Sequence, residues 1–475
     1  MGYPCEESMH TSKWPARLRT HESCQSVASS IAAAPHSATS GFMSSPKRPV
    51  LLCDGGYYGT LAATRTLGAN GVPVLVADSN ILAPALWSRQ VAGRFRCPPA
   101  SDTERFVAWA RTLGQRYGRP VICPTSDDVS LVLALYRREL ERDFHFYQPD
   151  LDTLLNLLDK SKLAQVVRGA GLDMPETWSP GNLQEAEEVI RDQRGHLLIK
   201  PRTQSLLNTH SKGTIVLGGR EESVRTYTKF RRRNVLAPQL AARFPDWTLP
   251  IVQRYHPEAV DKVYSIAGFI DRGGQNMAVR AAEKVFQLPG RLGTGLCFQS
   301  AEVEVELASG LKRLLQSIGY FGIFEAEFIR LPGRSLLIDI NGRLYNQLAF
   351  DVARGLPLPT LFYEGALGNH EAVAAAIAAA AGADSTGPQA FCNRSRLAVL
   401  LGLRRILGTM PKQAAAHWRE WCEADPDAVI DAAADPEDPW PRRFDLLLQL
   451  HSYLRHPRAF IRNTGYEQPQ DQGAG

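Results

Sequence analysis

Short apolar runs alternate with amphipathic segments along most of this chain. The first apolar run, Val50 to Cys53, leads into a glycine turn at residues 55–59 and a helical pattern that extends through Leu67. A second apolar run, Pro73 to Ala77, follows a short turn and ends on Asp78. Alternation of this kind predicts a βαβ unit and a parallel sheet.

A further apolar run, Arg119 to Pro124, precedes a segment with helical periodicity, TSDDVSLVLALYRREL. The Thr-Ser pair that opens this segment can cap the helix, and the two aspartates after it complement the dipole of the helix N-terminus. We therefore expect a first compact unit that closes near residue 150.

The next part of the chain mixes helices with successive strands. A helix ends at Gly171, and the short apolar strand HLLIKPR carries Lys200 near its end. Residues 202–219 are polar and predict a loop. After them the pattern predicts strands in PIVQRYH, KVYSIAGFID and NMAVRAAEKVF, a helix in LASGLKRLLQSIG, and two strands in FGIFEAEFIRLPGRSLLIDINGR that a Pro-Gly turn joins. From about residue 370 the pattern is helical.

The last of these strands carries polar residues at every second position, namely Asp339, Asn341 and Arg343. Side chains alternate between the two faces of a strand. These three side chains should therefore share one face, while Ile338 and Ile340 should point into the core.

The preceding strand offers Glu325 and Glu327 on one face. If the two strands pair through the Pro-Gly turn, Glu327 approaches Asp339. Two carboxylates without a counter-ion would be costly to ionise, whereas Mg²⁺ prefers oxygen ligands and is usually held by one or two carboxylates plus phosphate groups. The row therefore predicts a magnesium site of one or two ions. A solvated polar strand face is the alternative for the row taken alone.

Together with earlier motifs, this row resembles the metal-binding core of the ATP-grasp superfamily. These enzymes carry Asp-Lys at the start of a helix that ends in Gly followed by Pro, as at Asp159-Lys160, and a strand that ends in Lys-Pro, as at Lys200-Pro201. The segment VQRYHPE resembles their adenine-gripping hinge. The resemblance covers about residues 49–368 and is closest to D-aspartate ligase-like and carboxylate–amine ligases.

The resemblance implies an α/β (α+β) fold with several parts. A Rossmann-like pre-ATP-grasp domain is expected at residues 49–150, and a two-lobed ATP-grasp domain at 151–369, with its lid lobe at about 175–255. A helical C-terminal extension is expected at 370–475, and a disordered N-terminal tail at 1–48.

The resemblance also implies roles for individual residues. Lys160 and Lys200 would neutralise ATP phosphates, as point charges do well, and Arg343 would face the transferring phosphoryl group. The expected adenine contacts are Gln253, Tyr255 and His256, and the ribose contact is Asp261, with Glu258 as its rival. The expected Mg²⁺ ligands are Glu327, Asp339 and Asn341, with Mn²⁺ as a substitute for the metal. Arg280 and Lys284 are expected to bind the carboxylate substrate or the acyl-phosphate.

The chain departs from the family pattern at two places. The loop that covers the phosphates is usually glycine-rich, but here it holds one glycine, so it would rely on the side chains of Ser211 and Lys212 instead of backbone amides. In the metal row, Asp339 stands where most members have Glu, and Gly342 stands where many have Pro.

The function implied by the resemblance is ligation of a small-molecule carboxylate to an amine through an acyl-phosphate. Two alternatives stay open. One is a nicotinamide-dependent oxidoreductase that uses the glycine turn and Asp78, although GGxxxG is not the GxGxxG fingerprint. The other is a binding protein that has the fold but no catalytic activity.

Composition and charge bear on the possible partners and on the cellular location. The 475 residues are 44% apolar and 22% charged, as in ordinary globular proteins, and the net charge of +5 is spread along the chain, which argues against a nucleic-acid partner. The eight cysteines form no CxxC pair, which favours a reducing, cytoplasmic location over a disulfide framework.

The C-terminal hundred residues mix leucine with arginine at roughly helical spacing, as in RSRLAVLLGLRRILG and RRFDLLLQLHSYLRHPRAFIR. A basic amphipathic helix can lie on an anionic membrane surface. The alternative is a helix that packs on its own protein with a solvated basic face. The sequence leaves the oligomeric state open, and a homodimer is compatible with it.

Overall fold

The described residues begin at Lys47, at the start of one compact unit. In this computed structural model they are residues 47–206, 213–216, 219–257, 263–288, 293–382, 387–408, 410, 412–423 and 428–455. Of the tail predicted at residues 1–48, all but the last two residues lie outside the described residues. The predicted domain boundaries stay predictions.

The first sheet is parallel, with strand order β3-β2-β1-β4. It consists of β1 (Val50–Leu52), β2 (Val74–Asp78), β3 (Val91–Arg96) and β4 (Val121–Cys123), with helices α1 (Tyr58–Ala69), α2 (Thr103–Arg116), α3 (Asp127–Leu135) and α4 (Arg137–Leu140) and the 3-10 turn η2 (Pro84–Trp87). The predicted βαβ unit is confirmed. The apolar pattern does not predict β3, because this strand lies at the sheet edge and its residues alternate between half-buried and exposed.

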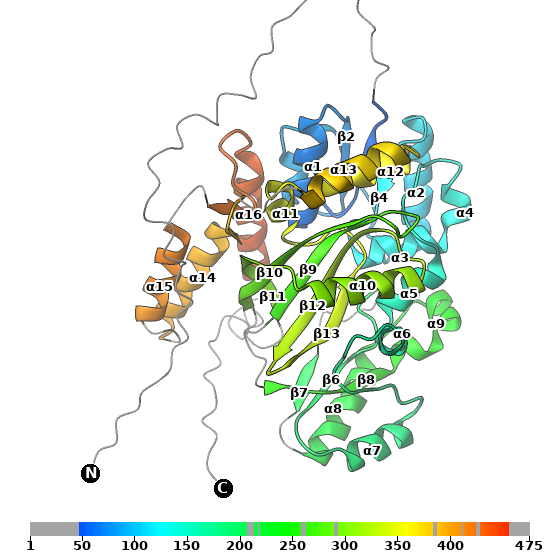
Figure 1. Cartoon of the computed structure of the whole chain (residues 1–475), viewed down its shortest axis with the longest axis vertical. Helices are drawn as coiled ribbons and strands as arrows, with labels where there is room; N and C mark the ends of the chain where they lie inside the picture. The colour runs from blue at the N-terminus through cyan, green and yellow to red at the C-terminus, as the bar shows by residue number, and fades with distance from the viewer. Residues whose placement is uncertain are drawn as a thin grey trace, which may run out of the picture. The chain divides into compact units, whose positions relative to one another are not determined.

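A second, largely antiparallel sheet has the strand order β13-β12-β9-β10-β11-β14-β15. Figure 1 labels its strands β9 to β13. Its first five strands in chain order are β9 (Val263–Ile270), β10 (Met277–Leu288), β11 (Thr294–Ala301), β12 (Gly322–Leu331) and β13 (Arg334–Asn341). Helix α10 (Val305–Ser317) packs on this sheet, where Leu311, Leu314 and Leu315 share an apolar core with Phe324 and Ile340. This core fixes β12 and β13, the two strands that carry the acidic residues.

The third sheet, with order β5-β8-β6-β7, forms a small lobe. Its elements are β5 (Thr177–Trp178), α7 (Leu183–Asp192), β6 (Leu197–Pro201), β7 (Thr214–Val216), α8 (Arg220–Arg233), α9 (Pro238–Arg243), η3 (Pro245–Thr248) and β8 (Pro250–Arg254). The prediction of an uninterrupted loop over residues 202–219 is wrong at β7. That strand pairs with β6 over three residues, of which Thr214 is exposed and Val216 is buried, so it is too short to give a clear apolar pattern.

The helix predicted to end at Gly171 is broken in two, as α5 (Leu151–Leu158) and α6 (Lys160–Gly169). Asp159 separates them, because its side chain accepts hydrogen bonds from the backbone amides of Ser161 and Lys162 and so caps α6. Its other carboxylate oxygen accepts a hydrogen bond of 3.1 Å from the indole of Trp247. The break places Lys160 in the first turn of α6.

The C-terminal part contains strands as well as the predicted helices. The helices are α11 (Leu348–Ala353), α12 (Leu358–Ala366), α13 (His370–Gly382), α14 (Arg394–Ile406), α15 (Lys412–Glu423) and α16 (Trp440–Arg455). Strands β14 (Ala390–Cys392) and β15 (Val429–Asp431) extend the second sheet beyond β11. Within the described ranges, no helix is long and apolar enough to cross a membrane.

Candidate active site

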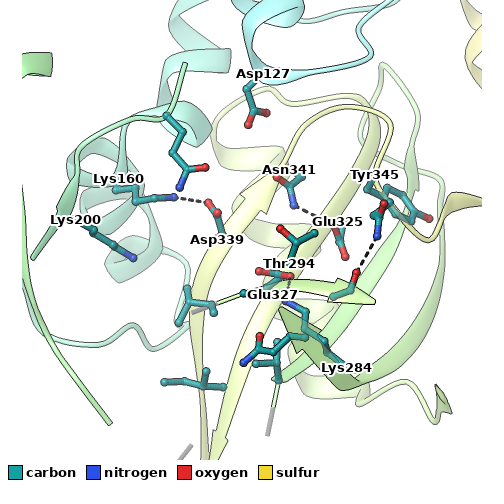
Figure 2. Close-up of a pocket in the computed structure, with 18 of the residues that line it drawn as sticks. Asp127, Lys160, Lys200, Lys284, Thr294, Glu325, Glu327, Asp339, Asn341 and Tyr345 are labelled. Atoms are coloured by element: carbon teal, nitrogen blue, oxygen red, sulfur yellow. Dashed lines mark hydrogen bonds and ion pairs between the residues drawn. The ribbon is translucent and has the colours of Figure 1, made fainter. Parts of the chain in front are cut away.

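A cavity of about 480 Å³ opens where β12 and β13 meet the third sheet and the start of α3 (Figure 2). Three parts of the fold contribute to its wall. Its polar and charged lining includes Tyr57, Ser126, Asp127, Asp128, Lys160, Lys200, Gln253, His256, Lys284, Glu325, Glu327, Asp339, Asn341, Arg343 and Gln347. Most residues that the sequence predicts for the site therefore come together here.

The row of polar residues lies on one side of the β12–β13 hairpin as predicted. Glu327 is the register partner of Asp339, and Glu325 is the register partner of Asn341. The expectation for Ile340 is confirmed, because it is 2% exposed and lies in the core. The expectation for Ile338 is wrong. The pairing shifts by one residue between Glu327 and Phe328, and this bulge lets Ile338 line the cavity.

Lysines approach both carboxylates of the row. Lys160 Nζ lies 2.7 Å from Asp339 Oδ1, and Lys284 Nζ lies 2.6 Å from Glu327 Oε1. Figure 2 shows Lys160 and Lys200 on one side of the cavity, facing Asp339. The cavity thus places positive charge beside each carboxylate.

Lys200 differs from the other two lysines. It is buried and lines the cavity, yet within the described residues no hydrogen bond or ion pair is found for its ammonium group. Burial, together with the positive charge of Lys160, lowers the pKa of Lys200 to about 7. An anion in the cavity would stabilise its charged form.

Glu325 joins the row as a residue without a predicted role. Its carboxylate accepts a hydrogen bond of 3.0 Å from Asn341 Nδ2 and another from Gln347 Nε2. Burial, and then the charge of Glu327, raise the pKa of Glu325 to about 7. Its position two residues before Glu327 was the available signal, whereas nothing in the local sequence marks Gln347.

The side chain of Arg343 is held by Asp127, at the start of α3, the helix that follows strand β4 of the first sheet. Its Nε donates to Asp127 Oδ1 at 2.7 Å and its Nη2 to Asp127 Oδ2 at 3.2 Å, in a bidentate pair. Nη2 also donates to Asn341 Oδ1 at 2.9 Å. Burial alone would lower the pKa of Arg343, but the Asp127 carboxylate raises it above its usual range. The sequence explained Asp127 as a helix-start residue and missed this long-range pairing.

The predicted adenine contacts lie on and just beyond β8. Gln253, Tyr255 and His256 all line the cavity, and Gln253 Nε2 donates to Thr177 Oγ1 at 2.7 Å. The predicted residues Ser211, Lys212 and Asp261, with the rival Glu258, lie outside the described residues.

Arg280 does not reach the cavity. Its guanidinium donates to the backbone carbonyls of Val279, Arg354 and Ala380, at distances of 2.9 to 3.1 Å. Lys284, four residues further along β10, does line the cavity. The structure therefore gives Arg280 a place in the packing between β10 and the helices that follow β13.

The glycine turn after β1 has its own internal partners. Asp78 accepts hydrogen bonds from the backbone amides of Gly56 at 3.0 Å and Asn80 at 2.7 Å. A Cβ atom on Gly59 would lie 2.5 Å from the carbonyl oxygen of Tyr345. This close packing covers the start of α1. The backbone hydrogen bonds occupy the carboxylate of Asp78, which a dinucleotide ribose would need. The turn therefore does not favour the oxidoreductase alternative.

The residues of the row suit a magnesium ion that phosphate oxygens complete. Glu327, Asp339 and Asn341 present oxygen atoms on neighbouring strands, the donor type that Mg²⁺ prefers. Among the described residues, no group of three or more His, Cys, Asp or Glu side chains is placed to hold a metal by itself. A metal here would therefore need ligands from a bound phosphate as well.

Comparisons with known proteins support this fold. Neither protein-family models nor curated proteins give a match. Among solved structures, a biotin carboxylase domain of the 2-oxoglutarate carboxylase from Hydrogenobacter thermophilus, in complex with MgADP, ADP and bicarbonate, is 16% identical with a TM-score of 0.55, over 68% of this chain and 70% of that one.

Biotin carboxylase from Campylobacter jejuni gives the same identity and TM-score, over 68% of this chain and 71% of that one. The L-amino acid ligase from Bacillus licheniformis is 13% identical with a TM-score of 0.50, over 68% and 74% of the two chains. At these identities the likeness shows the fold alone, and it confirms the fold expected from the sequence.

Proposed function

We propose, from the premise that this chain has the ATP-grasp fold, that it is an ATP-dependent ligase joining a carboxylate to an amine through an acyl-phosphate. One observation carries the proposal: two buried lysines, Lys160 and Lys200, face the carboxylates of Glu327 and Asp339 across one cavity. An anion would complete the site at Lys200, and Mg²⁺ with a nucleoside triphosphate supplies that anion together with a cation that can take the place of Lys160 beside Asp339.

In this proposal, the cavity binds ATP between the third sheet and the β12–β13 hairpin. Lys160 and Lys200 neutralise its phosphates, and Gln253, Tyr255 and His256 border the base. Glu327, Asp339 and Asn341 would hold Mg²⁺, which when bound supplies positive charge against the β- and γ-phosphates. Lys160 then exchanges its ion pair with Asp339 for a pair with phosphate.

The chemistry needs two balanced steps. First, a carboxylate oxygen of the substrate forms a bond to the γ-phosphorus, the bond from that phosphorus to the β–γ bridging oxygen breaks, and ADP leaves. Second, the amine nitrogen forms a bond to the acyl carbon, phosphate leaves with the carbon–oxygen bonding pair, and the nitrogen loses a proton to solvent. Arg343 stabilises the charge on the transferring phosphoryl group. Catalysis here depends on positioning and electrostatics, so no nucleophilic side chain is required.

The two substrates would enter beside the wall formed by Tyr57, Asp127 and Asp128, where the first-sheet unit meets the row. Lys284, held by Glu327, is the cation that we assign to the carboxylate or acyl-phosphate. Arg280 has no part in the proposed reaction because it lies outside the cavity. We expect small-molecule substrates and a cytoplasmic enzyme, and a homodimer is compatible with this proposal.

The test is ADP release in a screen of carboxylates against amines, with Mg²⁺ or Mn²⁺. We expect ADP only when a matching pair is present, and tight binding of a non-hydrolysable ATP analogue with Mg²⁺. Lys200→Met should weaken that binding. Lys312→Met is the matched control, because Lys312 is half-buried on α10 and donates to the carbonyl of Gln275 away from the cavity.

The outcomes separate the alternatives. Nucleotide binding without ADP release for any pair would favour the inactive binding protein. No nucleotide binding by the wild type would overturn the proposal itself. Binding that Lys200→Met leaves intact would also overturn the assignment of this cavity.

A further inference from the structure

Helix α16 (Trp440–Arg455, red in Figure 1) has its polar and apolar faces reversed. Its buried positions are Pro441, Asp445 and Gln449, which recur every four residues along one face. Its opposite face carries a stripe of leucines, Leu447, Leu450 and Leu454, which are 48%, 54% and 75% exposed, and Arg443 and His451 are exposed beside them. A helix that packs on its own protein normally buries the apolar stripe instead.

Hydrogen bonds hold α16 in this orientation. The Asp445 carboxylate accepts from the hydroxyl of Tyr58 on α1 at 3.0 Å and from Nδ2 of Asn393, just before α14, at 3.0 Å. Within α16, Gln449 Nε2 also donates to this carboxylate at 2.7 Å. In addition, the ring of Phe444 stacks on Trp87 with centroids 3.9 Å apart. Rotating α16 to bury its leucines would leave these polar groups unpaired, so the exposed stripe is a built feature of the fold.

The charges on the outer surface of α16 are of one sign. Arg442, Arg443 and Arg455 are exposed, whereas Asp445, the one acidic residue in the sequence of this helix, is buried. Trp440, at the start of the helix, is 51% exposed. An apolar stripe with flanking arginines and a tryptophan has the composition of a helix that lies in the plane of an anionic lipid surface.

The same charges oppose pairing with a second copy of the chain. An antiparallel pair that sets Leu447 against Leu450 also brings Arg442 against Arg455 of the other copy. A parallel pair sets Arg443 against itself. Like charges at such contacts are unfavourable, whereas an anionic surface complements every one of them.

We propose that the outer face of α16 is a docking surface for a membrane that contains anionic lipids. The leucines would enter the boundary between headgroups and acyl chains, and the arginines would bind the headgroups. This binding would hold the protein at the membrane surface. This proposal stands independently of the ligase activity.

The experiment is co-sedimentation of the full chain with vesicles of phosphatidylcholine alone or mixed with phosphatidylglycerol. We expect binding only to the mixed vesicles, weakened by added salt. The double variant Leu450→Ser/Leu454→Ser should lower the partition constant by about tenfold or more, because burial of two leucines is lost. Val305→Ser is the matched control, since Val305 is 70% exposed at the start of α10.

A second pair of variants tests the charges. Arg442→Gln/Arg455→Gln should weaken binding and flatten its salt dependence, while Arg105→Gln, on α2, should leave both unchanged. Unchanged melting temperatures would show that the leucine and arginine variants remain folded. Equal binding to both vesicle types, or binding that survives the leucine variant, would overturn the proposal. So would light scattering that shows a dimer, without lipid, that only the leucine variant dissociates.

Discussion

Strand β10 contributes to two clusters of buried charge that differ in how completely they are satisfied. The closed cluster consists of Arg280, Asp351 and Arg354, and the pocket cluster of Lys160, Lys200, Lys284, Glu327 and Asp339. In the closed cluster, both guanidinium groups donate to backbone carbonyls, and Arg354 also pairs with Asp351. In the pocket cluster, the ammonium of Lys200 faces a cavity, with no ion pair to any described residue.

This difference distinguishes charged residues that stabilise the fold from charged residues that can bind a ligand. A buried charge that faces no cavity and has its partners inside the protein stabilises one packing and cannot reach a ligand. A buried charge that faces a cavity, and whose pKa is shifted by burial, can bind a ligand of opposite charge. From sequence, Arg280 and Lys284 look alike, and only their surroundings distinguish them.

The largest effect that we expect comes from the pocket cluster. Lys200→Met should lower the rate of ADP release by about 10²–10³-fold, because it removes a cation from the transferred phosphate in a water-poor site. Thermal unfolding should change little or shift upward, since the ammonium is costly to bury. Steady-state kinetics with a matched substrate pair and a melting curve measure both, and an undiminished rate would remove Lys200 from the site.

A large loss of stability, rather than of chemistry, is expected in the closed cluster. Arg354→Met should lower the free energy of unfolding by about 3–5 kcal/mol, because the buried carboxylate of Asp351 loses its cation. Urea denaturation measures this change. The fraction that remains folded should still bind the ATP analogue. A stable variant that no longer binds nucleotide would break the distinction between the clusters.

The two residues on β10 make the sharpest matched pair. Lys284→Met should lower ADP release by about tenfold to 100-fold, since a positioned cation near the acyl-phosphate is lost. Arg280→Met should instead lower the melting temperature and leave the turnover of folded enzyme within about twofold of wild type. Measuring turnover per folded molecule for both variants tests the comparison. The reverse pattern would return Arg280 to the role that the sequence suggested.

The smallest effect is a pH linkage at Lys200. Its pKa is about 7 in the folded chain against 10.5 as the ordinary value, so between these pH values the unfolded chain holds more protons. Stability contributed by this group therefore rises as the pH rises through that window. The phosphates of a nucleotide stabilise the charged ammonium. Within this pH window, nucleotide binding should therefore be accompanied by the uptake of up to about one proton.

Calorimetry in two buffers that differ in ionisation enthalpy measures this uptake. In Lys200→Met the uptake should disappear, while Lys312→Met should retain it. Proton release on binding by the wild type would show that another group dominates the electrostatics of the cavity.

The sequence predicted those helices, strands and turns that have a clear local pattern of apolar, polar or turn-forming residues. The alternation of Asp339, Asn341 and Arg343 and the Pro-Gly turn predicted the strand pairing that sets Glu327 opposite Asp339. Strands β3, β5, β7, β14 and β15 escaped prediction because they are short or lie at or near sheet edges. Strand β11 also escaped prediction, although it has eight residues and lies inside the second sheet, because its apolar stretch is only Leu296 to Phe298. The single-residue shift that turned Ile338 toward the cavity also has no local signature.

The sequence by itself determined which chemical groups the site could contain: a lysine at the start of a helix, a lysine near the end of a strand, a row of oxygen ligands and one arginine. Only the tertiary structure decided which of these groups meet. Asp127 pairs with Arg343 across more than two hundred residues, and Arg280 and Lys284 separate into different surroundings although they lie on one strand. The physical reason is that a charge acquires its role from partners and burial, and distant segments supply both.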